Sequence, residues 1–190
     1  MFLESQIDPP MQNGSIEVIC GSMFSGKTEE LLRRLKRAKY AKLKIKIFKP
    51  KIDTRYDKDK IVSHDDNFIN SLVVKTAADI IPLAKNTDVI AIDEAQFFDN
   101  TLYTVCNQLA INGVRVIVAG LDMDFLGNPF GPIPNLLSIA EHITKVHAIC
   151  VDCGKLANHS FRKSEDEELV KLGEHNEYKP LCRHCFIQQI

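Results

Sequence analysis

The chain has 190 residues, which is enough for one substantial core with a small appendage but cramped for two full domains. Its 24 Lys and Arg residues almost balance its 25 Asp and Glu residues, so no global field draws it to nucleic acid or a membrane surface. The opening segment lacks the parts of a signal peptide, and no apolar run reaches the ~18 residues of a membrane span, so we expect a cytoplasmic protein.

The first part of the chain predicts a strand, a loop and a helix. Residues 1–14 are expected to be a flexible N-terminal segment, and residues 15–20 (SIEVIC) read as a short buried strand. In residues 28–39, Leu and Ala side chains line one helical face. The basic side chains of residues 33–46 are interpreted as a solvated face, and residues 43–48 alternate as a second strand.

The middle of the chain continues this alternation. A polar, turn-rich stretch at residues 53–68 comes before a short helix that is broken near Pro82. Residues 88–93 and 114–120 are continuous apolar runs, typical of strands covered on both faces, and apolar residues with helical spacing lie between them. Strands alternating with helices predict an α/β domain over residues 15–149, with a parallel sheet flanked by helices.

The segment GSMFSGKT lies between the first predicted strand and the first predicted helix, and it matches the phosphate-binding pattern G-x-x-x-x-G-K-[ST] in full. Its glycines let backbone N–H groups turn toward phosphate oxygens, and the helix adds its positive N-terminal end. Lys27 is expected to reach the β- and γ-phosphates of ATP, and Thr28 to coordinate Mg²⁺. The sheet is therefore predicted to be of the P-loop NTPase type, with a loop formed by Gly21, Ser22, Met23, Phe24, Ser25, Gly26, Lys27 and Thr28.

Two adjacent carboxylates, Asp93 and Glu94, stand at the end of the run DVIAID. In nucleotide-binding enzymes, an acidic residue at the end of a buried strand downstream of a phosphate-binding loop typically helps to hold Mg²⁺. We therefore expect Asp93 to bind the metal. Adjacent side chains of an extended strand point to opposite faces, so we expect Glu94 to be free to act as the general base of a kinase. The alternatives are a solvated Glu94 beyond the strand and a P-loop ATPase in which Glu94 activates water.

Short polar pieces flanked by cysteines predict a separate subdomain over residues 150–190. CVDC and CRHC are two C-x-x-C knuckles, and four thiolates so arranged suit tetrahedral Zn²⁺. The long interval between the knuckles predicts a lasso-like loop that a structural zinc ion pins at both ends. Two redox pairs, or a nearby histidine replacing one cysteine, are the alternatives, and Cys20 and Cys106 are expected to be inert core thiols. The predicted zinc ligands are Cys150, Cys153, Cys182 and Cys185.

Together these motifs resemble one family, the type II or cytosolic-type thymidine kinases. The matching segments include GSMFSGKT, KPKIDTRY, SHD, IDEAQFF, GLDMDFLGNPFG, CVDC and NEYKPLCRHC. The resemblance implies ATP-dependent phosphorylation of the thymidine 5′-hydroxyl, with Glu94 as the proton acceptor and with ATP, Mg²⁺ and a structural Zn²⁺ bound. It also implies a homotetramer and feedback by dTTP.

The same resemblance assigns residues to the two substrates. It implies that Phe125 stacks on the base and that Tyr178 helps to close the site. It places Asp53 and Arg55 near the phosphates, where a guanidinium can offset developing charge. The nucleotide is further assigned Asp93, Glu94, Ala95 and Gln96, and the nucleoside Met23, Phe97, Ser160 and the covering segment Leu169, Val170, Lys171, Leu172 and Gly173.

Ser160 departs from the family pattern, which often has Thr near the thymine methyl group. The loss of one methyl group changes discrimination by only ~1–3 kcal/mol, so thymidine remains the expected substrate and deoxyuridine becomes a second one. A nucleic-acid-binding zinc module that uses ATP as a switch is a further alternative. Near-zero net charge and few basic residues around the knuckles argue against it.

Overall fold

The computed structural model describes residues 14–51, 60–61, 69–163 and 177–189. Within these ranges six strands form one sheet in the order β5-β2-β6-β7-β1-β8. Every neighbouring pair is parallel, so the carboxyl ends of all six strands meet at one edge of the sheet. The strands are β1 (Ser15–Cys20), β2 (Ile45–Pro50), β5 (Leu72–Val74), β6 (Val89–Ile92), β7 (Arg115–Gly120) and β8 (His142–Lys145). A separate short pair joins β3 (Lys60–Ile61) to β4 (Ile69–Asn70).

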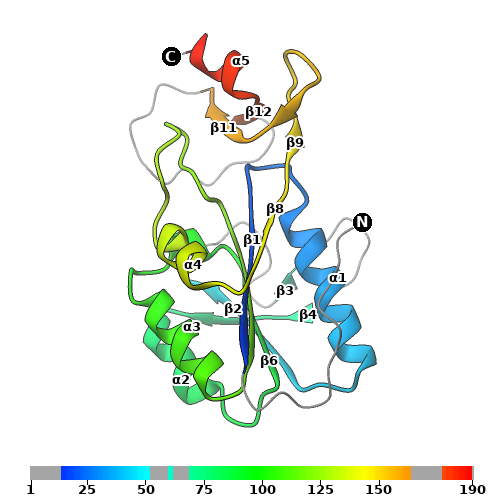
Figure 1. Cartoon of the computed structure of the whole chain (residues 1–190), viewed down its shortest axis with the longest axis vertical. Coiled ribbons are helices and arrows are strands. Elements are labelled where there is room, and N and C mark those ends of the chain that lie inside the picture. Colours follow the sequence, from blue (N-terminus) through cyan, green and yellow to red (C-terminus); the bar gives the residue numbers. More distant parts are fainter. Residues whose placement is uncertain (1–13, 52–59, 62–68, 164–176, 190) are drawn as a thin grey trace.

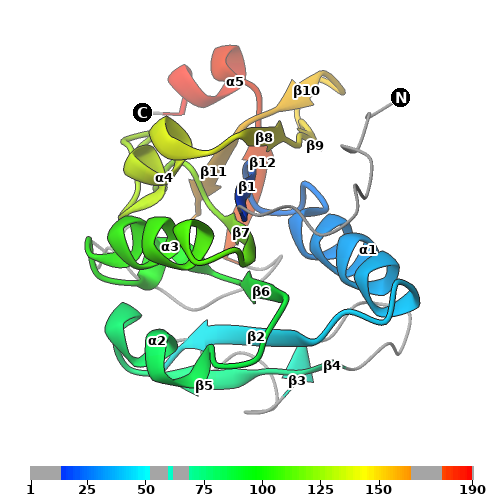
Figure 2. The same ribbon diagram turned by 60° about the horizontal axis from the view of Figure 1, so that its bottom comes forward.

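Helices cover both faces of the sheet, which confirms the predicted α/β architecture. Figure 1 shows α1 on one side and α2, α3 and α4 on the other, and Figure 2 shows the same two layers from a second direction. In the part of the chain that the structure describes, no helix combines the length and the apolar character needed to cross a membrane. The helices are α1 (Lys27–Tyr40), α2 (Ile80–Leu83), α3 (Leu102–Ile111) and α4 (Ile133–Ile139), with the 3-10 turns η1 (Ala77–Asp79) and η2 (Ala95–Phe97).

Strand alternation divides the core into two layers. On β1, Ile16 and Val18 pack toward α2, α3 and α4, whereas Ile19 packs toward Leu31 and Leu35 of α1. Because β1, β6 and β7 are covered on both faces, nearly every residue in them is apolar and buried. The continuous apolar runs of the sequence follow from this double burial.

One ionic cluster is buried beneath α1. Glu17 of β1 accepts hydrogen bonds from Arg34 Nη1 at 2.6 Å and from Arg115 Nε at 2.5 Å, and Arg34 Nε also pairs with Glu30 at 2.8 Å. Burial alone raises the pKa of Glu17, but Arg115 and Arg34 outweigh it and hold that pKa below its ordinary value. Arg34 is only 5% exposed, so the prediction of a solvated basic face is wrong at this residue, whose guanidinium ties α1 to β1.

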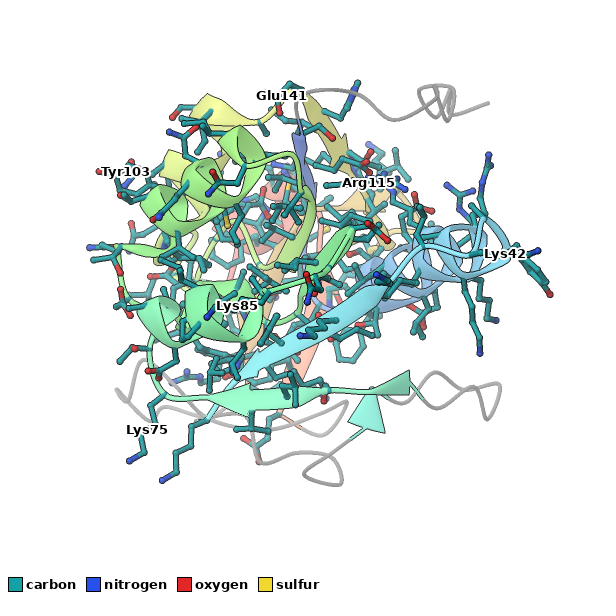
Figure 3. All side chains as sticks on the ribbon, turned by 90° about the horizontal axis from the view of Figure 1, so that it is seen from below. Lys42, Lys75, Lys85, Tyr103, Arg115 and Glu141 are labelled. Atoms are coloured by element: carbon teal, nitrogen blue, oxygen red, sulfur yellow. The ribbon has the colours of Figure 1, made fainter. Side chains whose placement is uncertain are left out.

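The rest of the basic face is solvated as predicted. On α1 the side chains of Arg33, Lys36 and Arg37 are exposed. Figure 3 views the molecule from the end opposite the cysteines, where Lys42 extends outward after α1 and Arg115 lies on the side of the sheet that α1 covers. Partners on β1 and β8, Glu17 and Thr144, therefore distinguish Arg34 from its neighbours in the sequence.

The C-terminal region forms a small layer beyond the carboxyl edge of the sheet (Figure 1). Two antiparallel pairs build it, β9 with β10 and β11 with β12, and a short helix follows. Its core consists of Ala148, Cys150, Ala157, Leu181, Cys182, Cys185 and Phe186. The elements are β9 (Ala148–Ile149), β10 (Leu156–Ala157), β11 (His159–Arg162), β12 (Tyr178–Leu181) and α5 (Arg183–Ile187).

Candidate active site at the carboxyl edge of the sheet

The phosphate-binding loop leaves the end of β1 and enters α1. Gly21 has φ 147°, and a Cβ there would lie 2.1 Å from the Val146 carbonyl oxygen, so no larger residue fits without moving the backbone. Gly26 has φ 83° and caps α1. Phe24 takes φ 62° although it is not glycine, a strain typical of ligand-binding loops. The loop thus turns at the positions that the sequence pattern predicts.

Side chains within the loop hold its shape. Ser25 Oγ and Lys27 Nζ both donate to the Ser22 carbonyl oxygen, each at 2.7 Å. The Lys27 ammonium group therefore folds back over the loop from the first residue of α1, and Thr28 follows on the first helical turn. A cation and a helix N-terminus at one strand end suit the binding of phosphate groups.

The C-terminal subdomain braces the same loop from outside. The Ser160 hydroxyl of β11 accepts a hydrogen bond from the Met23 N–H at 2.9 Å, and Ser22 Oγ donates to the Ala157 carbonyl oxygen at 3.4 Å. The Phe24 ring packs against the core of the subdomain. Because Ser160 is buried, water does not compete for its hydroxyl. A threonine would keep this hydroxyl, so the departure from the family pattern leaves the bond to Met23 intact.

The carboxylates at the end of β6 are arranged differently from the prediction. The strand ends at Ile92, and Glu94 adopts the left-handed conformation, with φ 52° and ψ 41°. Buried Asp93 accepts the Glu94 N–H at 3.0 Å through Oδ1. The expectation that strand alternation separates the two carboxylates is therefore wrong, because the backbone turns at Glu94 instead of continuing as a strand.

Gln96, which the resemblance assigns to the nucleotide, lies beneath Glu94 and is 2% exposed. Its Nε2 donates to Glu94 Oε2 at 2.6 Å, and its Oε1 accepts the Leu121 N–H at 3.0 Å. Ala95 is also fully buried. Gln96 thus joins the residues that follow β6 to those that follow β7.

Phe125 and Tyr178 both contact Arg162, a residue that the sequence interpretation missed. Arg162 Cζ is 3.7 Å from the Phe125 ring centroid and 5.6 Å from that of Tyr178. Its Nε and Nη2 donate to the Tyr178 hydroxyl at 3.3 Å and 3.1 Å, and the residue is 4% exposed. Strand alternation places Arg162 on the same side of β11 as Ser160, and this spacing was the available signal.

The structure describes only some of the remaining residues that were predicted to bind the nucleoside or the phosphates. Phe97 ends η2 and meets Phe130 edge-on, with ring centroids 5.7 Å apart. Met23 is half-buried within the phosphate-binding loop. The other predicted residues lie outside the described part of the chain, and their roles stay predictions: Asp53, Arg55, Leu169, Val170, Lys171, Leu172 and Gly173.

The four predicted zinc ligands come together at one point. All four Sγ atoms lie within 4.8 Å of one another, and those of Cys153 and Cys182 are 3.6 Å apart. Sulfurs bound tetrahedrally at Zn–S distances of ~2.3 Å would be about 3.8 Å apart, whereas a disulfide requires ~2.05 Å. The 3.6 Å contact joins the two knuckles, which fits one Zn²⁺ better than two separate redox pairs.

The four thiols differ in how readily they ionise, because the pKa values of Cys150 and Cys182 lie below the ordinary value and those of Cys153 and Cys185 lie above it. The Cys185 N–H donates to Cys182 Sγ at 3.5 Å, which holds the pKa of the Cys182 thiol below its ordinary value. A lowered pKa favours the thiolate, which is the form that binds zinc. No histidine in the described ranges joins the four sulfurs, and His159 instead stacks on Phe186 at 4.4 Å.

The two other cysteines are core thiols, as predicted. Cys20 ends β1 and Cys106 lies on α3, and both are buried. Burial raises the pKa of Cys20 to about 11 and that of Cys106 to about 12. Both thiols therefore stay protonated and poorly nucleophilic at neutral pH.

Known proteins resemble this chain over almost its whole length. The family model described as "Thymidine kinase" matches residues 14–186. A thymidine kinase of Bacteroides thetaiotaomicron is 56% identical over 188 residues, which cover 99% of this chain and 94% of the relative. A thymidine kinase of Bacteroides fragilis is 58% identical over 186 residues (98% and 94%), and one of Porphyromonas gingivalis is 58% identical over 184 residues (97% and 90%). Matches of this length and identity mean that the chain belongs to the thymidine kinase family.

Proposed function

We propose that this chain transfers the γ-phosphoryl group of ATP to the 5′-hydroxyl of thymidine, forming dTMP and ADP. The 5′-oxygen attacks the γ-phosphorus while the bond from that phosphorus to the β–γ bridging oxygen breaks. The hydroxyl proton passes to Glu94, and ADP leaves with the bridging oxygen. Phosphoryl transfer depends mainly on positioning and charge stabilisation, so each part of the site should either position a reactant or stabilise charge.

The phosphate-binding loop positions the donor in this proposal. Backbone N–H groups at the start of α1 and the Lys27 ammonium group bind the β- and γ-phosphates. Thr28 and Asp93 are the candidate ligands of Mg²⁺, which neutralises charge on the transferred group. Their support is position, because both follow carboxyl ends of strands in one parallel sheet.

The turn at Glu94 is the observation that carries the proposal. A left-handed conformation costs a non-glycine residue about 1–2 kcal/mol, and such strain persists mainly where the surrounding structure requires it. Here the turn directs a half-buried carboxylate onto the Gln96 amide instead of continuing the strand. A carboxylate held at the phosphate-binding edge of the sheet suits a group that accepts a proton from a hydroxyl.

The acceptor site is proposed to lie between the C-terminal subdomain and the loops after β6 and β7. Arg162 covers one face of Phe125, so a pyrimidine would stack on the opposite face. Phe97 and Met23 are proposed as pocket walls, and Tyr178 is proposed to act through Arg162, to which its hydroxyl is bonded. A dry pocket between these parts would favour transfer to the nucleoside over transfer to water.

Reaction class and substrate are tested together by measuring ADP and nucleoside monophosphate with the full chain. The assay covers the four deoxynucleosides and deoxyuridine, with ATP and Mg²⁺ present. We expect one ADP per dTMP and the highest kcat/KM with thymidine, followed by deoxyuridine. ADP formation that does not respond to any nucleoside would instead indicate an ATPase.

The role of Glu94 is tested by Glu94→Gln, which preserves shape but accepts no proton. We expect kcat to fall about 10²- to 10⁴-fold, while the ATP dissociation constant changes by less than about threefold. Glu141→Gln is the matched control, because its amide oxygen can still accept the Ile16 N–H that Glu141 accepts at 2.6 Å. Near-normal turnover of Glu94→Gln would remove Glu94 from the base role.

A further inference from the structure

Gln96 makes contacts that the binding of ATP does not require. It is 2% exposed and lies under the Glu94 turn as the second residue of η2. Both ends of its side-chain amide are used within the protein, one by Glu94 and the other by Leu121. A nucleotide could reach this amide only if the chain around it moved.

The Leu121 backbone fixes which way the amide points. A backbone N–H can only donate, so the Leu121 N–H at 3.0 Å selects Oε1 of Gln96 as its partner. Nε2, which can only donate, is then directed at Glu94 Oε2 at 2.6 Å. Gln96 is therefore a donor to Glu94 with a single orientation.

Two glycines close the protein around Gln96. A Cβ on Gly120 would lie 2.9 Å from Gln96 Oε1, and a Cβ on Gly131 would lie 2.2 Å from the Gln96 carbonyl oxygen. Gly131 also has φ 52°, a conformation that disfavours other residues. The end of β7 and the chain before α4 thus approach Gln96 so closely that its backbone and amide have little freedom.

The sheet order gives this arrangement a functional meaning. β7 lies between β6, which leads to Glu94, and β1, which leads to the phosphate-binding loop. The hydrogen bond to Leu121 therefore fixes the position of the Glu94 carboxylate, through Gln96, relative to β7, the strand next to β1 and its phosphate-binding loop. We propose that Gln96 is a positioning residue, which holds Glu94 Oε2 at a set place relative to the bound phosphates and does not itself bind ATP.

This proposal rests on the proposed role of Glu94 as the base. Gln96→Met fills a similar volume but donates no hydrogen bond. Because a misplaced catalytic group loses on the order of 10²-fold, we expect kcat to fall about 10- to 100-fold with the KM values for ATP and thymidine within about threefold. Gln108→Met, on the exposed side of α3, is the matched control and is expected to leave both parameters unchanged.

A double-mutant cycle separates the failure of this proposal from failure of the proposed function. In a Glu94→Gln background, Gln96→Met is expected to change the remaining kcat by less than about threefold, because the group that it positions is already gone. An equal loss in both backgrounds would overturn the positioning role alone. A raised KM for ATP with normal kcat would overturn it too, by making Gln96 a nucleotide ligand. Full activity of Glu94→Gln would overturn both proposals.

Gln96→Glu tests the same hydrogen bond with less change in shape, and it replaces Gln96→Met if that variant does not fold. It places a second carboxyl group against Glu94, so a shared proton restores one hydrogen bond. The kcat of Gln96→Glu relative to the parent chain is therefore expected to rise as the pH is lowered from about 8 to about 6. A ratio that stays flat over this range would contradict the proposal.

Discussion

The sheet domain and the cysteine subdomain are stabilised in different ways. Both layers of the sheet contain rows of fully buried Ile, Val and Leu side chains. Among the described residues, the buried core of the subdomain has two large side chains, Leu181 and Phe186, with Phe24 and Phe161 packed against it, and its other members are alanines and zinc-ligand candidates. So small an apolar core offsets little of the entropy of ordering the chain, and we therefore expect the four cysteines and a bound metal to stabilise the subdomain. Yet this weaker part touches the phosphate-binding loop.

Replacing a predicted zinc ligand is expected to have the largest effect, because it should unfold the cysteine subdomain and spare the sheet domain. Structural zinc contributes an apparent 10–16 kcal/mol in small peptides, so Cys185→Ser should unfold the subdomain while the sheet domain stays folded. Zinc content, measured by mass spectrometry, should fall. New protease cleavage sites should appear in the chain after β8. Because Met23 loses its partner Ser160, the KM for ATP should rise together with the KM for thymidine.

Cys106→Ala is the control for that experiment, because Cys106 is a core thiol of the sheet domain. It should keep its zinc and lose only stability of the sheet. A zinc-free Cys185→Ser protein with unchanged KM values would show that the subdomain does not brace the loop.

The next largest effect is expected in the sheet domain. Glu17→Gln removes the more deeply buried of the two ionic partners of Arg34 and leaves Glu30 as the other, so the free energy of unfolding should fall toward the limit of about 3–5 kcal/mol for a broken buried pair. Urea unfolding should show this loss with normal zinc content. Arg33→Gln, on the exposed side of the same helix, should cost less than about 1 kcal/mol. If Glu17→Gln and Arg33→Gln lowered the free energy of unfolding equally, the buried Arg34–Glu17 pair would be no more stabilising than the exposed Arg33–Glu30 pair.

The contribution of Glu17 also has a defined pH dependence. Because its pKa is lowered on folding from the ordinary value of 4.5, its stabilisation is fully present above that value and is lost as the pH falls through the folded pKa. The difference in unfolding free energy between the parent chain and Glu17→Gln should therefore narrow only in acid. A difference that already narrows near neutral pH would contradict the assignment.

A moderate loss of thymidine binding is expected from changes at the proposed acceptor site, which lies between the two regions. Arg162→Met removes the cation over Phe125 and the donors to the Tyr178 hydroxyl, at a cost of about 1.5–3 kcal/mol. The KM for thymidine should rise about 10- to 100-fold while that for ATP changes little. Arg162→Lys should recover only part of the loss, because an ammonium group lacks the planar fork. An unchanged KM for thymidine would place Arg162 outside the acceptor site.

The smallest effect is expected at Ser160. Ser160→Ala removes the acceptor of the Met23 N–H, at a cost of about 1 kcal/mol, and should raise the KM for ATP a few-fold. Ser160→Thr keeps the hydroxyl and adds a methyl group, so ATP kinetics should be retained while the preference for thymidine over deoxyuridine shifts by less than about 100-fold. Identical ATP kinetics for the two variants would show that the bond to Met23 is unimportant.

Prediction from the sequence succeeded where the information is local or periodic. The pattern GSMFSGKT includes the glycines that its own backbone turns require, and the apolar runs of β6 and β7 reflect burial on both faces. Two C-x-x-C knuckles are enough to indicate a tetrahedral thiolate site. Each of these features depends on residues that are close together in the sequence, so the sequence alone is enough to predict it.

The errors and omissions arise where a residue depends on a distant strand. Arg34 looks like its solvated neighbours until Glu17 of β1 and Thr144 of β8 are placed beside it. Glu94 looks like a strand residue until its carboxylate accepts a hydrogen bond from Gln96, whose own amide oxygen is held by the Leu121 N–H after β7.

The sequence by itself thus determined the α/β alternation, the phosphate-binding loop, the acidic strand end and which four cysteines come together. Only the tertiary structure decided the direction of the Glu94 carboxylate, the burial of Arg34 and the contacts of Arg162 with two aromatic rings. The physical reason is that β7 enters the sheet between β1 and β6. That insertion sets which backbone and side-chain groups meet at the carboxyl edge, and no local pattern encodes it.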